Sequence, residues 1–570
     1  MTWDRTYMLR LARLNTCLVL ILALGVPTSL MASEAIPQEV AQAVRILLDG
    51  KGDDREALYQ KVAAGADGRL VPLFRAYYAG TLARRGDQIV IYQSPVENSA
   101  IAGKGYPVVD AFTLAPVLTA DGRQELALEL GSDMIKAPRK ERARVSEVIS
   151  VLTLADPDLG ARKQAIIEVG DRGDASLLPA LKAQWSREPP RVIARVLEET
   201  IARIELVHGA TRDIRLAAAT KLVEVGTSRC SSTLAKANEH AKAEGDVELE
   251  RAILAASASL ESHLSRMRFV QTSFAGLSLG SILILMALGL SIIFGVMGVI
   301  NMAHGEFMMV GAFTTLAVSN LFKAHLPPSL YDYYFIAAIP AAFLVAGLVG
   351  VLCEVLVIRH LYGRPLETLL ATWGISLGLI WLARDRFGDT VSLTPPTWLV
   401  GGWEIAPDCI LPLNRLFIIG LCATCIAVVY YIIGKTKMGL LLRATTQSRT
   451  MAGCLGVPTR RVDGLTFGLG AGLAGLAGVA VPLFDKINPQ MGQGYIVDSF
   501  MVVVVGGVGK LVGSIVAGLG MGFITKYLEP LIPGTGSVIY TKIIVLLLII
   551  AILQKRPSGL FPARGRLAEA

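Results

Sequence analysis

The chain has 570 residues, of which 53% are hydrophobic and 18% charged, and its formal net charge is +8 at pH 7. This composition is more apolar than that of a typical soluble protein, and the seven cysteines show no metal-binding spacing. Much of the positive charge lies in short segments between apolar runs, which is typical of membrane loops and argues against nucleic-acid binding.

The first 35 residues have the layout of a signal peptide. Basic residues precede an apolar stretch from Leu14 to Val26, and the small-x-small sequence Ser33-Glu34-Ala35 follows it. The apolar stretch is too short to cross a bilayer comfortably. Residues 1–35 are therefore predicted to be a cleaved leader, and an uncleaved N-terminal anchor is the alternative.

Residues 36–265 are predicted to form an exported, mostly helical soluble domain with a small β segment. Apolar residues recur with helical periodicity over 36–85. Near 87–118 the pattern changes, and the segments 88–93 and 106–112 are predicted to be short strands. Helical patterns return after the β segment and continue to the end of the domain.

The helical part of this domain is weakly repetitive. The segment that begins at Pro157 resembles the segment that begins at Pro190, and Arg212-Asp-Ile-Arg215 repeats part of both. Gly170 and Gly226 are predicted to end the first helices of such repeats. This layout is typical of stacked helix pairs of the HEAT type, in which each pair needs a neighbour to bury its apolar face.

Residues 266–570 are predicted to form a polytopic α-helical membrane domain with about eight or nine spans. Most of its apolar segments reach the roughly 20 residues that a spanning helix needs. The two segments around Gly507 are short for two full spans and are alternatively a pair of half-helices. The predicted spans lie near 272–297, 304–322, 334–358, 366–384, 410–433, 464–484, 496–509, 511–528 and 538–553.

Basic residues decide the predicted orientation. They fill the loop at 359–364, the long loop at 435–461 and the C-terminal segment, where Arg564 and Arg566 lie. The positive-inside rule places such segments in the cytoplasm. Nine spans and a cytoplasmic C-terminus then place the N-terminal domain on the opposite side, in agreement with a leader.

Asn301, His304 and Glu306 form the most informative motif, because they lie between two long apolar segments. A charge at the centre of a membrane helix costs roughly 2.5–3.5 kcal/mol on insertion scales. Such groups must face other helices or a water-filled path, so they serve packing or transport. His304 and Glu306 are alternatively a structural pair that satisfy each other.

The long loop after residue 435 is predicted to dock on another protein. It contains few acidic residues and combines small residues with basic ones, although an ordinary basic loop is the alternative. Gly507-Val-Gly509-Lys510 lacks the first glycine and the hydroxyl residue of a nucleotide-binding loop, so ATP would be used by a separate subunit. The candidate docking residues are Gly439, Arg443, Ala444, Arg449, Ala452, Gly453 and Gly456.

Five glycines recur along one predicted span, at Gly464, Gly468, Gly472, Gly475 and Gly478. Small residues at such spacing let membrane helices approach closely. They are predicted to be packing elements, either within the chain or at an interface with a partner permease.

Taken together, these motifs resemble the inner-membrane permeases of the branched-chain amino acid class of ABC importers. The resemblance covers about 270–562 and rests on Gly298–Glu306, Arg443–Pro458, Gly464–Gly478 and Arg556–Phe561. Within that class, the segment from Leu361 to Gly374 and the long N-terminal domain look most like the urea permease subunit.

The resemblance implies a multi-pass subunit of a bacterial inner-membrane importer, with the N-terminal domain in the periplasm. Its partners would be a second permease, two ABC ATPases, a periplasmic substrate-binding protein and membrane lipid. The loop from Arg443 to Pro458 would dock on an ATPase. This chain would be a transport subunit rather than an enzyme, and it would bind no cofactor, metal or nucleic acid.

A urea path should offer neutral polar groups rather than a fixed charge clamp, although helix–helix hydrogen bonding is the alternative role for each such group. The other hypotheses are a branched-chain amino acid permease, an ATP-independent urea channel and a membrane-anchored interaction protein. The candidate path residues are Asn301, His304, Glu306, Thr372, Trp373, Ser376 and Thr466.

Overall fold

The computed structural model describes residues 38–48, 55–65, 67–85, 88–93, 96–98, 103–117, 126–127, 134–156, 158–186, 189–406, 408–534, 536–557 and 559–561. The predicted signal peptide and the basic residues Arg564 and Arg566 lie outside them. The chain divides into two compact units, and each is described separately below. The first contains residues up to Val225 together with Thr233–Ile253, and the second contains Gly226–Ser232 and Leu254 onward.

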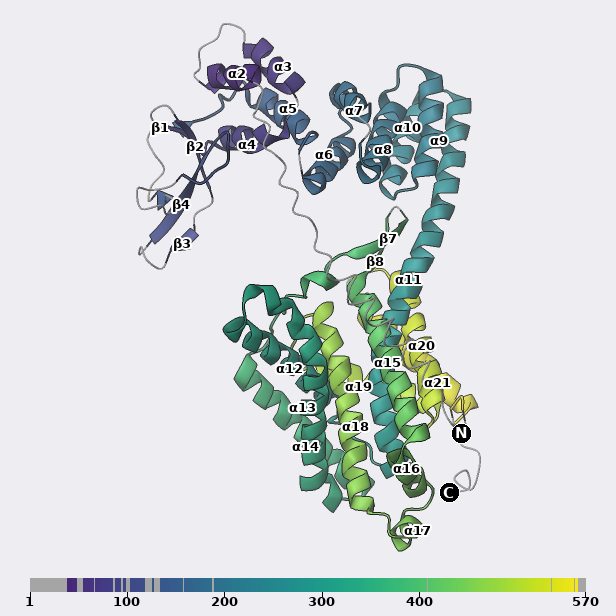
Figure 1. The fold of residues 1–570 in the computed structure, drawn as a ribbon. Coiled ribbons are helices and arrows are strands. Elements are labelled where there is room, and N and C mark those ends of the chain that lie inside the picture. Colours follow the sequence, from purple (N-terminus) through teal and green to yellow (C-terminus); the bar gives the residue numbers. More distant parts are fainter. Residues whose placement is uncertain are drawn as a thin grey trace, which may run out of the picture. The chain divides into compact units, whose positions relative to one another are not determined.

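The first unit begins with helices that pack on an antiparallel sheet, as Figure 1 shows at the purple end of the chain. The strand order is β3-β4-β2-β1-β6, with β5 paired to β4. The predicted strands at 88–93 and 106–112 correspond to β2 and β4. The elements are α2 (Gln38–Leu48), α3 (Arg55–Gly65), α4 (Val71–Ala79), β1 (Leu82–Arg85), β2 (Gln88–Tyr92), β3 (Val96–Asn98), β4 (Gly103–Asp110), β5 (Leu126–Ala127), β6 (Met134–Ile135) and α5 (Arg142–Thr153).

One part of the helical prediction over 36–85 is wrong, because Leu82–Arg85 is strand β1. Gly80 ends α4 with φ = +76°, a left-handed conformation that closes a helix at little cost when the residue is glycine. Leu82 then pairs with Ile91 of β2 and is fully buried. The periodicity of the preceding helix extends across this short strand, so the sequence pattern alone did not reveal the change.

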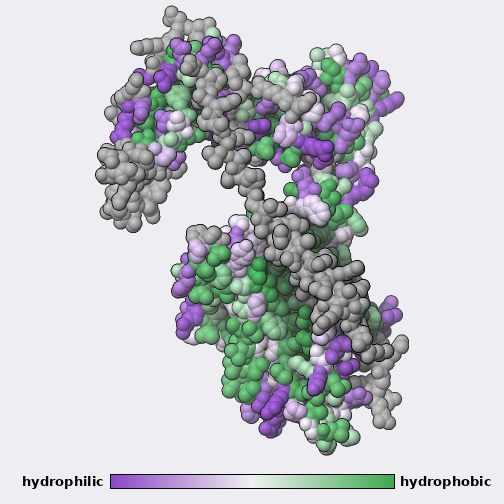
Figure 2. All heavy atoms as spheres, in the orientation of Figure 1, coloured by the Kyte–Doolittle hydropathy of each residue, from purple (hydrophilic) through white to green (hydrophobic). Residues whose placement is uncertain are grey.

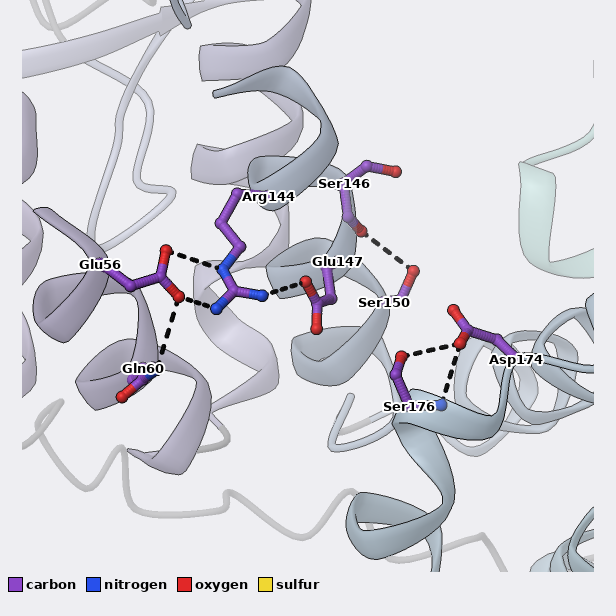
Figure 3. Close-up of polar contacts among 8 residues, drawn as sticks. All are labelled: Glu56, Gln60, Arg144, Ser146, Glu147, Ser150, Asp174 and Ser176. Atoms are coloured by element: carbon purple, nitrogen blue, oxygen red, sulfur yellow. Dashed lines mark hydrogen bonds and ion pairs between the residues drawn. The ribbon is translucent and has the colours of Figure 1, made fainter. Parts of the chain in front are cut away.

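Polar contacts join α3 to α5 across about ninety residues of sequence (Figure 3). Arg144 Nε donates to Glu56 Oε2 at 3.1 Å, and its Nη1 donates to Glu147 Oε2 at 2.5 Å. These side chains are partly exposed, so the ion pairs add about 0–1 kcal/mol at most. The apolar cluster beneath them, which includes Val44, Phe74 and Leu152, carries most of the stability of this region.

The rest of the first unit is helical. It contains α6 (Leu159–Arg172), α7 (Leu178–Trp185), α8 (Arg191–His208), α9 (Arg212–Val225), most of α10 (Arg229–Glu244) and the start of α11 (Val247–Met297). Gly226, with φ = +67°, follows α9 as predicted. Gly170 does not end α6, which continues to Arg172 and ends at Gly173. A side chain at Gly170 would stand 3.0 Å from Thr200 Oγ1, so this glycine instead lets α8 approach closely.

The second unit is polytopic and α-helical, and this confirms the predicted fold class. Among the described residues, eight helices are long and apolar enough to cross a membrane. The face of this unit that is visible in Figure 2, where it is not covered by grey atoms, is largely hydrophobic, as expected where lipid is the solvent. The eight are α11, α12 (His304–His325), α13 (Tyr334–Leu356), α14 (Pro365–Phe387), α15 (Leu413–Lys435), α18 (Thr459–Ala480), α20 (Leu511–Leu528) and α21 (Ser537–Lys555).

The segments around Gly507 are two separate helices. The predicted span at 496–509 is α19 (Met491–Gly506), which is shorter than the eight long apolar helices. A turn with Gly507 at φ = +97° joins it to α20, and the helices cross where Gly506 meets Gly513 without side chains between them. Leu560 N donates to Val505 O at 2.8 Å, so the C-terminal segment packs on this turn.

The span predicted to begin at residue 410 begins at Leu413. A two-stranded hairpin precedes it, formed by β7 (Gly402–Ala406) and β8 (Cys409–Pro412). Pro412 is the N-cap of α15 and cannot donate a backbone hydrogen bond, which suits the boundary between strand and helix.

Helix α18 lies at the centre of the second unit, and its glycines allow the close packing. Side chains at Gly468, Gly472 and Gly475 would collide with Val351, Phe343 and Ala346 of α13. A side chain at Gly478 would overlap the backbone of α12 at Met308, and one at Gly464 would stand 3.4 Å from Glu354 Oε2. Gly468, Gly472, Gly475 and Gly478 therefore pack closely against other helices of the same chain.

Candidate functional site

The polar motif lies in the short connection from α11 to α12 and in the first turn of α12. Gly298, at φ = +64°, follows the last residue of α11. Asn301 Oδ1 then accepts a hydrogen bond from Ala303 N at 3.1 Å, which shapes the turn into α12. Asn301, His304 and Glu306 are at most 1% exposed. The motif is therefore buried among helices, as the sequence predicts for polar groups in a membrane span.

Three helices meet at this motif. His304 Nε2 donates to the carbonyl oxygen of Met286 in α11 at 3.1 Å. Ser376 Oγ of α14 donates to Glu306 Oε1 at 2.8 Å. Thr372 Oγ1, one turn earlier on α14, accepts from Met302 N at 3.2 Å. His304 and Glu306 thus have separate partners, and the alternative that they satisfy each other is wrong.

Two candidate path residues lie elsewhere. Trp373 is 51% exposed, whereas Thr372 and Ser376 are buried four residues apart on one face of α14. Thr466 Oγ1 donates to Val462 O, one turn earlier on its own helix, at 2.6 Å. The other five candidates lie on α14, in the first turn of α12 and in the connection that precedes α12.

Three buried atoms of the motif have no hydrogen-bond partner within the described residues. They are Asn301 Nδ2, His304 Nδ1 and Glu306 Oε2. A buried polar group that lacks a partner costs about 1–3 kcal/mol, and such groups are rare in native proteins. Three such atoms within six residues therefore indicate groups that another conformation, water or a solute satisfies.

The predicted docking loop contains two short helices, α16 (Lys437–Gln447) and α17 (Arg449–Cys454). Thr436 and Ser448 cap them by accepting from Gly439 N and Met451 N. Gly439 must be glycine, because a side chain would overlap the backbone of Ile433. Arg443, whose Nε donates to Gly439 O, stays on its own helix, and Ala444 is half-buried.

The remaining docking candidates divide between buried and exposed positions. Ala452 is buried, whereas Gly453 and Gly456 are exposed. Arg449 turns inward to Asp463 at the start of α18. Its guanidinium carbon lies 3.9 Å from the centre of the Tyr362 ring. Burial raises the pKa of Tyr362, and the nearby Asp463 carboxylate acts in the same direction.

The structure adds an apolar surface to this segment that the sequence analysis missed. Leu455 is 81% exposed, and Leu440 and Met451 are exposed as well. Met451 and Leu455 are four residues apart, a spacing that places them on one helical face. Large apolar side chains in a basic loop were the signal that would have identified this surface.

Two hollows lie at opposite ends of the helices. A cleft of about 810 Å³ is lined by Ser291 of α11, by Arg443 and Met451 of the docking loop, and by Gly509. A cavity of about 380 Å³ lies among α11, α19, α20 and α21, where Lys542 pairs with Asp498 at 3.1 Å. Within the described residues, no group of three or more His, Cys, Asp or Glu side chains forms a metal site.

Eight apolar helices long enough to cross a membrane, together with a buried polar motif that has unpartnered atoms, indicate a membrane transport protein. Residues 272–553 match the family described as the permease component of the branched-chain amino acid transport system. With the relatives described next, this places the chain in the branched-chain amino acid ABC permease family. No solved structure matches the chain.

The chain is similar to curated permeases over its second half. The high-affinity branched-chain amino acid transport system permease protein LivH of Salmonella typhimurium is 30% identical over 301 residues, or 51% of this chain and 95% of that protein. The probable LivH of Methanocaldococcus jannaschii is 27% identical over 49% and 88%. BraD of Pseudomonas aeruginosa is 26% identical over 51% and 95%. These relatives are transport components rather than enzymes.

Because permeases of this family work with ATPase subunits, the exposed apolar surface predicts a docking contact. Replacing Leu455 by aspartate should lower ATP-dependent uptake about 10- to 150-fold, since burying a leucine contributes about 1.5–3 kcal/mol. Co-purification of the ATPase with the chain measures the loss directly. Leu455→Met, which keeps an apolar side chain, is the matched control. Full retention of the ATPase by Leu455→Asp would refute the contact.

Proposed function

We propose that this chain is the permease subunit of an ATP-driven importer of urea or short amides. The solute crosses by alternating access, and no bond in it is broken on this chain. ATP is bound and hydrolysed by separate subunits, whose movement reaches the permease through α16 and α17.

The unpartnered atoms of the motif carry this proposal. Asn301 Nδ2 is a donor. His304 Nδ1 is an acceptor, because the other ring nitrogen donates to Met286. Glu306 Oε2 is an acceptor when the glutamate is ionised. Urea offers the complementary set, because its carbonyl oxygen accepts hydrogen bonds and its two amino groups donate them. A neutral solute of this kind needs no charged clamp, and it would satisfy the buried groups as it passes.

A branched-chain amino acid is the second candidate solute, and the cavity among α11, α19, α20 and α21 favours it. A zwitterion needs partners for both of its charges. This cavity is lined by Asp498 and Lys542 and by a second ion pair, Lys526 with Glu529 at 2.7 Å. The relatives named above transport branched-chain amino acids according to their names.

The proposal extends to the assembly and the orientation. The partners are a second permease, two ABC ATPases and a periplasmic substrate-binding protein in the bacterial inner membrane. The N-terminal domain is periplasmic behind a cleaved leader, and the basic C-terminal end is cytoplasmic. The family match begins at residue 272, so the domain before it is an addition to the common permease.

Uptake of labelled urea and of labelled leucine, each at micromolar concentration, tests the proposal. The comparison uses a deletion strain with and without the chain, before and after ATP depletion. ATP-dependent urea uptake that appears only with the chain is the expected result. Restored uptake of leucine alone would establish the second candidate. Urea flux that persists after ATP depletion would instead identify a channel.

A further inference from the structure

Arg449 was a docking candidate, but its guanidinium is paired with a buried acid of the same chain. Its Nη1 donates to Asp463 Oδ1 at 3.3 Å, and its Nη2 donates to Asp463 Oδ2. The Asp463 side chain is 2% exposed, compared with 38% for Arg449. The guanidinium also lies over the Tyr362 ring in the loop before α14. This two-point ion pair with a stacked ring fixes the start of α17 to the start of α18.

A second acid–arginine pair lies beside the first. Arg359 donates to both oxygens of Glu354 at the end of α13, with distances of 3.3 and 2.9 Å. Glu354 is also buried and packs against Gly464, the residue after Asp463. The two carboxylates lie within electrostatic range of each other. The ends of α13, α17 and α18 therefore meet in one cluster of two acids and two arginines.

This cluster limits how α17 can move. Gly456, at φ = +79°, and Pro458 lie between α17 and α18 and would otherwise let α17 swing on its own. Moving α17 away would leave the buried Asp463 carboxylate without its partner, which is strongly unfavourable. A displacement of the docking segment must therefore carry α18 with it.

Helix α18 leads from this cluster to the polar motif. Gly475 of this helix lies against Ala342 and Ala346 of α13, and Gly478 lies against the backbone of α12 at Met308. Phe467 of α18 packs edge-on against Phe307, the residue after Glu306. Closely packed helices transmit a shift as a unit rather than absorb it.

We propose that Arg449, paired with Asp463 and stacked on Tyr362, is a positioning residue that couples the ATPase-docking segment to the solute motif. The inference rests on the proposed function in two respects: α16 and α17 contact an ATP-hydrolysing subunit, and the solute passes the buried motif. It assigns Arg449 to energy coupling rather than to contact with the ATPase.

The test uses the full chain in the reconstituted complex with its partner subunits. Arg449→Met should retain ATP hydrolysis within about twofold, while solute taken up per ATP falls at least about tenfold. Asp463→Asn, which keeps the size of the side chain, should give the same result. Arg449→Lys should give a smaller loss, because lysine keeps the charge but cannot bind both oxygens in a planar fork. Arg460→Met removes an exposed arginine from the same turn of α18 and serves as the control.

A second measurement does not depend on the solute. A cysteine in place of Met302, beside the motif, reports through maleimide labelling whether ATP with vanadate changes access to the motif. That change should occur in the Arg460→Met background and disappear with Arg449→Met. The chain without the added cysteine gives the background labelling of native cysteines.

Two outcomes would overturn the coupling role. If both Arg449→Met and Asp463→Asn leave uptake per ATP unchanged, Arg449 has no role in coupling. A proportional fall of uptake and ATP hydrolysis, with the labelling change intact, would reduce the pair to a structural or docking role. If the wild-type complex carries neither urea nor leucine, the proposed solute fails, and the labelling result alone decides the coupling role.

Discussion

Replacing Glu306 by glutamine should lower uptake about 5- to 150-fold, because a buried polar group that loses its hydrogen-bond partner costs about 1–3 kcal/mol. Glutamine keeps one oxygen to accept the hydrogen bond from Ser376. It replaces the second, unpartnered oxygen by an NH2 group, so the motif loses an acceptor and gains a donor. The rate of labelled solute uptake, divided by the amount of chain in the membrane, measures the effect.

Ser319 provides the matched control. It is a fully buried serine on the same helix, and its hydroxyl contacts Tyr331 rather than the motif. Ser319→Ala should leave uptake within about twofold, because the hydroxyl that it removes does not contact the motif. Equal uptake by Glu306→Gln and the wild type would show that the motif serves only packing.

Replacing Gly478 by valine should prevent normal folding of the membrane unit. Its side chain would overlap the carbonyl oxygen of Met308 and stand 2.9 Å from the backbone nitrogen of Ala312. Overpacking against side chains costs about 1–3 kcal/mol, and a rigid backbone can yield less than a side chain. We expect little monodisperse protein after detergent extraction, and a lower unfolding temperature in what remains.

Gly420 of α15 is the control for this substitution, because a side chain there meets nothing within 4 Å in this chain. Valine has the same weak helix preference at both positions, and either replacement should slightly improve on the preference of glycine. The difference between the two variants therefore isolates the clash. An unfolding temperature of Gly478→Val equal to that of Gly420→Val would contradict the packing shown here.

The membrane spans were predictable because lipid offers few alternatives. An apolar run of about twenty residues must satisfy its own backbone, so it forms a helix. All eight long apolar helices overlap predicted spans. The boundaries were less accurate where a short element precedes a span, as at β8 before Leu413. In the first unit, strand β1 was missed because it is four residues long and follows a helix directly.

The site was predictable only in part. Asn301, His304 and Glu306 stand out because polar groups are rare in such surroundings. Their partners Met286 and Ser376 lie 18 and 70 residues away in the sequence, and no local pattern pairs them. Arg449 looked like a surface charge because the sequence does not show that α17 turns back on Asp463.

The sequence by itself determined the class of this protein, its spans, its basic loops and the segments that carry polar groups, because these follow from composition and local periodicity. Only the tertiary structure decided which helix faces meet. Gly311 faces Gly475, Ser376 reaches Glu306, and Arg449 is paired with Asp463. The physical reason is that helical periodicity defines a face without naming its neighbour. In lipid the hydrophobic effect does not select one helix pairing over another, so close packing and hydrogen bonds among distant residues must do so.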